Sequence, residues 1–371
     1  MTGNPVIPSP STSLRVNWSR DLSMNILAIE TSCDETAAAV VEDGTKIVSN
    51  VVASSTKMHE KYGGIVPEVA AREQLRCIIP VITEALVGSS LKNIDAIAVT
   101  VGPGLIGSLL VGVETAKTIA FATGKPIIPV NHVLAHMYAN FLDSDQKNLH
   151  FPAISLVVSG GHTELYLMKS IKDLTWLGGT LDDAAGECFD KTARLLGFGH
   201  GGGLAIQVAA KKCQMLHDKC QIKLPRPLLH DDTLNFSFSG LKTAVMREWK
   251  KYEDHSEELI NTFAHEIQES ITDVLVEKTL RAAKKYHAQS ILVSGGVAAN
   301  LRLREKFLTK LRSNNITNLT FHAPSPQLCT DNAVIIAAAA YFRGSFILSE
   351  VEGPTDWHTI TAVPNLSVEE I

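Results

Sequence analysis

Paired cysteines are missing from this chain of 371 residues. Its six cysteines form no C-x-x-C pair and follow no regular spacing; they are Cys33, Cys77, Cys188, Cys213, Cys220 and Cys329. This pattern argues against the disulfide framework of a small secreted protein. It is typical of reduced thiols in a cytosolic-type compartment.

Long apolar runs are also missing. The richest one, residues 333–341, is too short to cross a bilayer. The N-terminal region holds no apolar core of a secretory signal. We therefore expect no membrane-spanning segment and no membrane partner.

A strong excess of charge is the third absence. Charged residues make up 20% of the chain, and the formal net charge is −5. A globally basic nucleic-acid-binding protein is not indicated, so any such contact needs a local basic face. Two helical stretches offer one, the first with Lys242, Arg247, Lys250 and Lys251, the second with Arg302, Arg304, Lys306, Lys310 and Arg312. An ordinary solvated face explains each stretch equally well.

The length and the 45% of apolar residues are sufficient for two domains of ordinary size. Residues 1–23 are rich in Pro, Ser, Thr and Asn and show no periodicity, so we expect a disordered extension. Arg15 and Arg20 precede the first acid, Asp21, which leaves a transit peptide as the alternative.

A histidine pair organises the middle of the chain. His132 and His136 lie four apart in a helix-like run, 132–141, that follows a strand-like run, 126–130. At that spacing both imidazoles project from one helix face and can bind one divalent metal ion. A polar turn before a later helix offers Asp331 as a third ligand, which leaves coordination positions open. Two partly buried histidines with hydrogen-bond partners are the alternative.

Two stretches share one plan, an apolar strand, a turn of small or hydroxyl residues and an apolar return strand. They are residues 25–41, with Glu30, Ser32 and Asp34 in the turn, and residues 154–168, with Ser159, Gly160 and Gly161 in the turn. The repeated plan predicts a structural duplication, and the alternation of strands and helices predicts α/β sheets with helices on their faces. A second S-G-G turn at Ser294 follows another strand, where glycines allow close approach of a nucleotide.

These patterns predict a division of the chain. Domain I takes residues 24–131 plus about 325–345, and domain II takes 132–324 with a helical insertion at about 182–287. Residues 346–371 are expected to form a loose C-terminal tail.

The motifs together resemble one family, the tRNA N6-adenosine threonylcarbamoyltransferases, in the branch shared by bacteria and mitochondria. The stretches that carry the resemblance lie at 29–36, 102–105, 131–136, 158–163, 183–190, 237–242, 294–300 and 329–332, in the family's order. The resemblance implies the ASKHA fold of actin, chaperone ATPases and sugar kinases, with two duplicated RNase H-like domains. Where the family has Tyr-Pro-Gly-Gly-Pro, this chain has residues 200–204 without either proline.

The resemblance also implies roles for individual residues. His132, His136 and Asp331 would bind one metal ion, iron or zinc. Val157, Val158, Ser159, Gly160 and Gly161 would lie against the phosphate and acyl parts of the substrate, and Asp190, Gly203 and Asn300 would bind its adenosine portion. The turn with Glu30 and Asp34 would face the same cleft, and either carboxylate could serve as the general base.

The implied reaction transfers an L-threonylcarbamoyl group from its adenylate to N6 of adenosine 37 in tRNAs that read codons beginning with adenine, releasing AMP. The implied partners are tRNA, the adenylate, an inactive paralogue and an accessory ATPase if the protein is bacterial, and a second copy in a homodimer. The expected location is the cytoplasm, with the mitochondrial matrix as the alternative.

Two other functions stay open on the sequence alone. A metal-dependent peptidase would use the same histidine pair, but Val133 stands where the H-E-x-x-H motif has its catalytic Glu. A non-catalytic scaffold of the same fold is the binding-module alternative, although it would be expected to lack the three metal-ligating residues.

Overall fold

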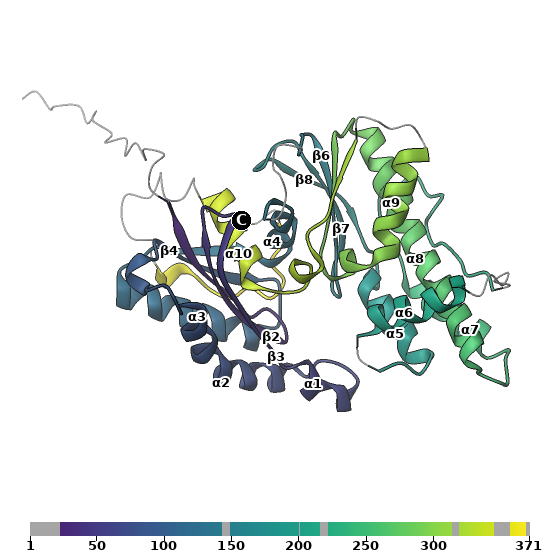
Figure 1. The fold of residues 1–371 in the computed structure, drawn as a ribbon, viewed down its shortest axis with the longest axis horizontal. Coiled ribbons are helices and arrows are strands. Elements are labelled where there is room, and N and C mark those ends of the chain that lie inside the picture. Colours follow the sequence, from purple (N-terminus) through teal and green to yellow (C-terminus); the bar gives the residue numbers. More distant parts are fainter. Residues whose placement is uncertain are drawn as a thin grey trace, which may run out of the picture.

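Two five-stranded sheets stand side by side in the computed structural model, which describes residues 23–142, 149–199, 201–215, 222–313, 319–344 and 357–368 (Figure 1). The first sheet has the order β3-β2-β1-β4-β5, and the second has the order β10-β9-β6-β7-β8. The strands of the first are β1 (Asn25–Glu30), β2 (Glu35–Glu42), β3 (Lys46–Ser54), β4 (Ala96–Gly102) and β5 (Ile127–Asn131). Those of the second are β6 (Ala153–Val158), β7 (Thr163–Met168), β8 (Leu174–Gly179), β9 (Ser290–Ser294) and β10 (Thr320–His322).

The two sheets repeat one topology. In the first, β1-β2-β3 is an antiparallel meander, and β4 and β5 extend it in parallel on the other side of β1. In the second, β6-β7-β8 and the parallel strands β9 and β10 have the same arrangement. The predicted pair of hairpins and the predicted duplication are therefore confirmed.

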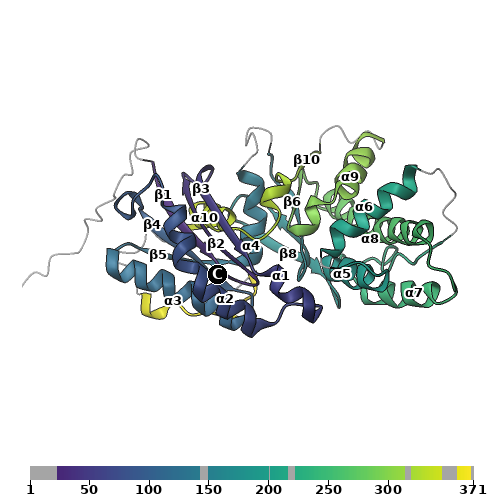
Figure 2. The same ribbon diagram turned by 60° about the horizontal axis from the view of Figure 1, so that its bottom comes forward.

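Helices cover the first sheet on both faces because its central strand is apolar on both. Leu27 and Ile29 of β1 face α2 (Pro67–Ala85) and α3 (Ile106–Thr123). Ile26 and Ala28, which alternate with them, face α4 (His132–Tyr138) and α10 (Ala333–Gly344). The same inner cluster includes residues of β6, β7 and β9, so α4 and α10 lie between the two sheets (Figure 2).

The outer face of the second sheet carries a large helical layer. It consists of α5 (Ala185–Leu195), α6 (Gly202–Met215), α7 (Ser239–Trp249), α8 (Glu257–Lys285) and α9 (Leu301–Ser313). The first four follow one another between β8 and β9, where a helical insertion is expected. The boundaries of the two domains stay predictions.

Two strands at sheet edges and one near the C-terminus do not follow from the sequence patterns. β3 has only exposed and half-buried residues, the first four residues of β8 are exposed or half-buried, and β10 is three residues long. Residues 357–368 also differ from the loose tail that we expect. Val363 donates a backbone hydrogen bond to Val101 of β4 (2.7 Å), and Ile360 and Leu366 are buried. Residues 346–356 and 369–371 of the predicted tail lie outside the described residues, and so do residues 1–22 of the predicted N-terminal extension.

Among the described residues, α3 is the one helix whose length and composition would allow it to cross a membrane. In this fold α3 packs against β4 and α2 and buries residues such as Leu109, Val113 and Ala116. It is therefore a core helix of the first domain. The five cysteines within the described residues are all free.

Candidate metal centre

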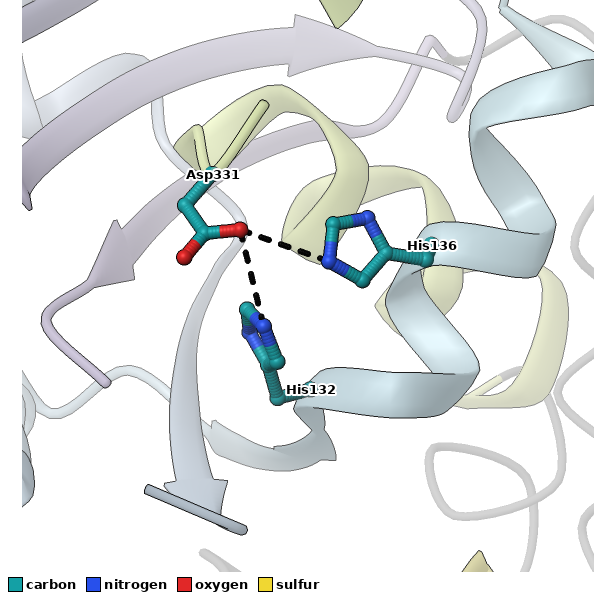
Figure 3. A group of neighbouring side chains, drawn as sticks. All are labelled: His132, His136 and Asp331. Carbon is teal, nitrogen blue, oxygen red and sulfur yellow. Dashed lines mark ion pairs between the residues drawn. The ribbon is translucent and has the colours of Figure 1, made fainter. Parts of the chain in front are cut away.

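Three side chains that are distant in the sequence meet between the two sheets. His132 and His136 lie on α4, and Asp331 lies directly before α10 (Figure 3). Oδ1 of Asp331 is 3.3 Å from Nε2 of His136 and 3.6 Å from Nε2 of His132. One potential ligand atom of each residue lies within 4.8 Å of the others, so the predicted trio is brought together.

Asparagine caps fix the two helix ends that present these residues. Oδ1 of Asn131 accepts hydrogen bonds from the backbone N–H groups of Val133 (2.9 Å) and Leu134 (3.1 Å). Oδ1 of Asn332 accepts from the N–H groups at positions 334 and 335, at 3.0 and 3.2 Å. Each cap satisfies amides of a first helical turn, so it sets where the helix begins and where the neighbouring ligand points. The side chain of Asn131 also donates to the carbonyl of Ser367 (3.1 Å), which ties the C-terminal segment to α4.

The environment of His136 fits a metal ligand. Its side chain is fully buried, and neither ring nitrogen makes a hydrogen bond within the described part of the chain. A buried polar group without a partner is costly, and a metal ion at Nε2 would remove much of that cost. The donor set of two imidazoles and one carboxylate is one that iron(II) and zinc accept. The residues present therefore fit the metal that the sequence implies.

Glu30 stands behind His132, on the side away from Asp331. Its carboxylate is fully buried, and Oε2 lies 3.3 Å from Nδ1 of His132. The backbone N–H of Ser32 donates to Oε1 (2.5 Å), and the hydroxyl of Thr100 donates to Oε2. Glu30 is thus held by three groups, and it faces a metal ligand rather than open space.

The charges at the centre depend on one another. Burial would lower the pKa of His132, but Asp331 and Glu30 on either side raise it to about 9. Burial would raise the pKa of Asp331, whereas His132 and His136 hold it below its ordinary value. For Glu30 too, His132 outweighs burial and lowers the pKa. Without a metal ion, a protonated His132 therefore lies between two carboxylates.

The sequence predicts no role for two titratable residues near the metal centre, Glu35 and His162. Burial and the charges of Asp331 and Asp34 raise the pKa of Glu35 to about 9, so its carboxyl group is neutral at pH 7. Burial and the neighbouring histidines His132 and His136 lower the pKa of His162 to about 4. Both residues belong to motifs quoted above, and only their position in the fold distinguishes them. Asp34, predicted as a candidate base, accepts a hydrogen bond from the hydroxyl of Thr56 (2.8 Å).

The Ser159 turn and the Ser294 turn lie close together around the ends of β6 and β9. Val157 and Val158 end β6 as buried residues, whereas Gly160 and Gly161 are exposed. Gly295 has a φ of +88°, and a Cβ there would lie 2.5 Å from the carbonyl oxygen of Val158. Only glycine allows this approach of one turn to the other. The Ser159 turn and the Ser294 turn therefore pack directly against each other through their backbones.

The three residues expected at the adenosine portion lie on or next to α6. A Cβ on Gly202 would lie 2.7 Å from Oδ1 of Asp190, so Asp190 packs against the first residue of α6, next to Gly203 in the sequence. Gln207 of α6 accepts a hydrogen bond from the N–H of Leu301 (2.7 Å), next to Asn300. The Asn300 side chain also caps α9 by accepting from the N–H of Leu303 (3.0 Å), and it donates to Gln268 (3.0 Å). Their roles toward a ligand stay predictions.

Known proteins with a similar sequence agree on one family. The family tRNA N6-adenosine threonylcarbamoyltransferase matches residues 46–338. The chain belongs to this family. Relatives named as that enzyme include those of Clostridium botulinum, 47% identical over 94% of this chain and 99% of the relative, and of Syntrophomonas wolfei, 49% identical over 86% and 92%. A third, from Persephonella marina, is 47% identical over 86% and 90%. Neither the peptidase nor the scaffold alternative is favoured.

Solved structures resemble this chain at the level of the fold. HypF in its phosphate- and nucleotide-bound form is 13% identical, with a TM-score of 0.55, and the likeness covers 90% of this chain and 47% of HypF. The (R)-2-hydroxyglutaryl-CoA dehydratase component A of Acidaminococcus fermentans is 14% identical. Its TM-score is 0.50, and the likeness covers 87% of this chain and 99% of that one. With the duplicated sheets, these likenesses establish the predicted ASKHA fold.

Proposed function

We propose that this protein transfers the L-threonylcarbamoyl group from threonylcarbamoyl-adenylate to N6 of adenosine 37 in tRNA and releases AMP. Membership of the transferase family supports the reaction class. The meeting of His132, His136 and Asp331 beside two glycine turns is the structural observation that supports this site. The tRNAs concerned would be those that read codons beginning with adenine.

The chemistry explains why such a site is needed. The exocyclic amine of adenine is a weak nucleophile, so the carbonyl carbon of the transferred group must be made more electrophilic. A divalent ion bound by three protein groups would supply a Lewis acid with open coordination positions. Backbone N–H groups of the Ser159 turn would bind the phosphate and the oxyanion that develops as N6 attacks the carbonyl carbon, before the bond to AMP breaks and AMP leaves. The ion would be iron(II) or zinc, which both accept this donor set.

The carboxylates take different parts in this proposal. Glu30 is buried and bound to Ser32, Thr100 and His132, so we assign it to positioning His132 rather than to proton abstraction. Metal-ligating histidines commonly donate their second ring N–H to such a carboxylate, which fixes the tautomer. Asp34 stays the candidate base, since its side chain is only half-buried and its carboxylate accepts a hydrogen bond from the Thr56 hydroxyl.

Mass spectrometry of tRNA nucleosides tests the proposed function. Unmodified tRNA is incubated with the protein and threonylcarbamoyl-adenylate, and we expect threonylcarbamoyladenosine at position 37 only. A tRNA with guanosine at that position is the substrate control, and His132→Ala/His136→Ala is the protein control. Modification of neither tRNA by metal-loaded wild-type protein, or full activity of the double variant, would contradict the proposal.

A second copy of this chain is a further proposed partner, beside the inactive paralogue and the accessory ATPase expected if the protein is bacterial. Among the described residues, α2 and α3 expose apolar side chains at Leu75 (65% exposed), Ile79 (62%), Ile106 (49%) and Leu110 (44%). The two helices touch, with an ideal Cβ of Gly107 only 3.3 Å from Ala71. We propose that a second copy of this chain covers this face. Leu75→Lys/Ile79→Lys should then shift the mass in solution from dimer to monomer; a wild-type monomer would contradict the homodimer and would favour the paralogue.

The location of the protein is also a proposal. A chain with reduced cysteines and a tRNA substrate fits the cytoplasm of a bacterium, and the mitochondrial matrix is the alternative. Residues 1–22, which would carry a transit peptide, lie outside the described residues. Expression of the full chain with a C-terminal fluorescent tag in a eukaryotic cell would separate the two, since only a transit peptide directs the tag to mitochondria.

A further inference from the structure

The fold distinguishes the two basic stretches of the sequence. On α9, Arg302 forms an ion pair with Glu269 (2.7 Å), and Lys306 forms ion pairs with Glu269 (2.9 Å) and Asp273 (2.5 Å). Lys310 pairs with Glu277, and Arg304 donates to two backbone carbonyls. Arg312 alone has no such contact within the described residues. Most basic side chains of α9 therefore form ion pairs with acidic residues of α8, which hold the two helices together.

The charges of α7 are not used in this way. Within the described part of the chain, no hydrogen bond or ion pair engages the side chains of Lys242, Arg247 or Lys250, and Lys251 pairs only with Glu248 (2.6 Å). At 100° per residue, positions 242, 247 and 250 fall within about 140° of the helix circumference. Arg247 and Lys250 are exposed and Lys242 is half-buried. One outward face of α7 thus carries three unpaired cations.

The start of α7 is fastened to the candidate site. The carboxylate of Asp182 accepts hydrogen bonds from the Ser237 and Ser239 hydroxyls (2.5 and 2.8 Å) and from the N–H of Phe238 (2.7 Å). Asp182 stands just before α5, and at the start of that helix the N–H of Gly186 donates to the carbonyl of Ser159 (3.2 Å). A Cβ on Gly186 would lie 2.4 Å from that oxygen, so α5 and the turn are in close contact.

These hydrogen bonds fix where α7 begins relative to the Ser159 turn. α7 begins one short link from the Ser159 turn and runs to the end of the molecule that is farther from the first sheet (Figures 1 and 2). Its 11 residues span roughly 16 Å, which is enough for several consecutive phosphates of a nucleic-acid strand. A tRNA whose adenosine enters the site would extend outward from the same turn.

We propose that the outward face of α7, with Lys242, Arg247 and Lys250, binds the phosphate backbone of the substrate tRNA. The proposal rests on the proposed function, because it takes tRNA as the substrate. Phosphate contacts of this kind fix the orientation of the nucleic acid without reading its sequence. They make binding dependent on salt, because each neutralised phosphate releases counterions.

The test measures tRNA affinity against salt concentration for metal-loaded, full-length protein. Lys242→Ala/Arg247→Ala/Lys250→Ala should weaken binding at least about tenfold at 0.15 M salt and should reduce the slope of log K against log salt by about 2 to 3. Lys92→Ala/Lys169→Ala/Lys284→Ala removes three exposed charges without described side-chain partners elsewhere, and its binding should match the wild type. The charge-keeping variant Lys242→Arg/Arg247→Lys/Lys250→Arg should restore binding, which separates lost charge from lost folding.

Other results of these measurements would contradict either the proposed function or the α7 face. Wild-type protein that binds no tRNA and transfers nothing would overturn the proposed function itself. Wild-type protein that binds tRNA, with the α7 variant binding equally well, would overturn the α7 face and leave the function standing. A larger loss in Arg312→Ala than in the α7 variant would place the contact on α9 instead. The KM for the adenylate should stay unchanged in all these variants, since α7 does not line its proposed site.

Discussion

The substitution Glu30→Gln probes the centre while keeping its size. One end of the amide can replace Oε1 and accept the hydrogen bond of the Ser32 N–H. The other end, now an NH2 group, would then face Nδ1 of His132 at the 3.3 Å position of Oε2. An amide that donates to Nδ1 favours the tautomer with its proton on Nε2. That nitrogen is the one directed at Asp331, so it would be closed to a metal ion.

The size of this effect follows from the lost partner. Replacing a group that orients a metal ligand commonly costs 10-fold to 100-fold in metal affinity, which corresponds to about 1.4 to 2.7 kcal/mol. We expect a loss in this range for Glu30→Gln. A competition titration with a chelator gives the affinity. Nitrogen NMR shifts of labelled histidine report the tautomer when they are recorded on metal-free protein above the His132 pKa of about 9, where the ring is neutral.

Glu35→Gln is the matched control for this prediction. It is also a carboxyl-to-amide change near Asp331, but among the described residues Glu35 makes no hydrogen bond or ion pair with His132, and its pKa of about 9 keeps it neutral at pH 7. Its metal affinity should remain close to the wild-type value. Equal losses in the two variants would show that the loss does not depend on the contact between residue 30 and His132. An unchanged His132 tautomer and affinity in Glu30→Gln would refute the positioning role.

Two further predictions follow from the metal centre and from the contact between the Ser159 and Ser294 turns. The pKa of His132 in the metal-free protein is raised from 6.5 to about 9, so its stabilising contribution is complete below pH 6.5 and is lost as the pH rises through 9. Metal binding must displace that proton, so calorimetry at pH 7 in several buffers should show release of about one proton, and release of none would contradict the charge assignment. Gly295→Ala should destabilise by about 2 to 3 kcal/mol, lowering Tm by ~3 to 4 °C for a chain of 371 residues, because φ is +88° and the Cβ would meet the Val158 carbonyl. Gly296→Ala, where a Cβ meets nothing within 4 Å, is its control, and equal Tm values would contradict this account of the turn.

The sequence predicts the central elements well because their patterns are local. β1 and β6 are continuous apolar runs before polar turns, and the histidines of α4 follow a helix-capping asparagine. β3 and β10 are missed because each is a strand only by pairing at a sheet edge, with little burial to mark it. The segment 357–368 is missed for a similar reason, since backbone contacts with Val101 and Gly104 hold it.

The residues of the site that local patterns mark are predicted, and those that depend on distant contacts are not. His132 and His136 reveal themselves by their spacing, and Asp331 by its place before a helix. The role of Glu30 does not appear in any local pattern, because its partner His132 is 102 residues away. The same is true of α9, whose basic residues resemble those of α7 in the sequence. Only the acidic residues of α8, brought alongside by folding, distinguish the two.

The central claim is that a metal ion held by His132, His136 and Asp331 is required for transfer to tRNA. The direct test is threonylcarbamoyl transfer by protein stripped with a chelator and then titrated with iron(II) or zinc. The account predicts no transfer by the stripped protein and full recovery at one ion per chain, with no recovery in His132→Ala/His136→Ala. Full transfer by protein that contains no metal would contradict it.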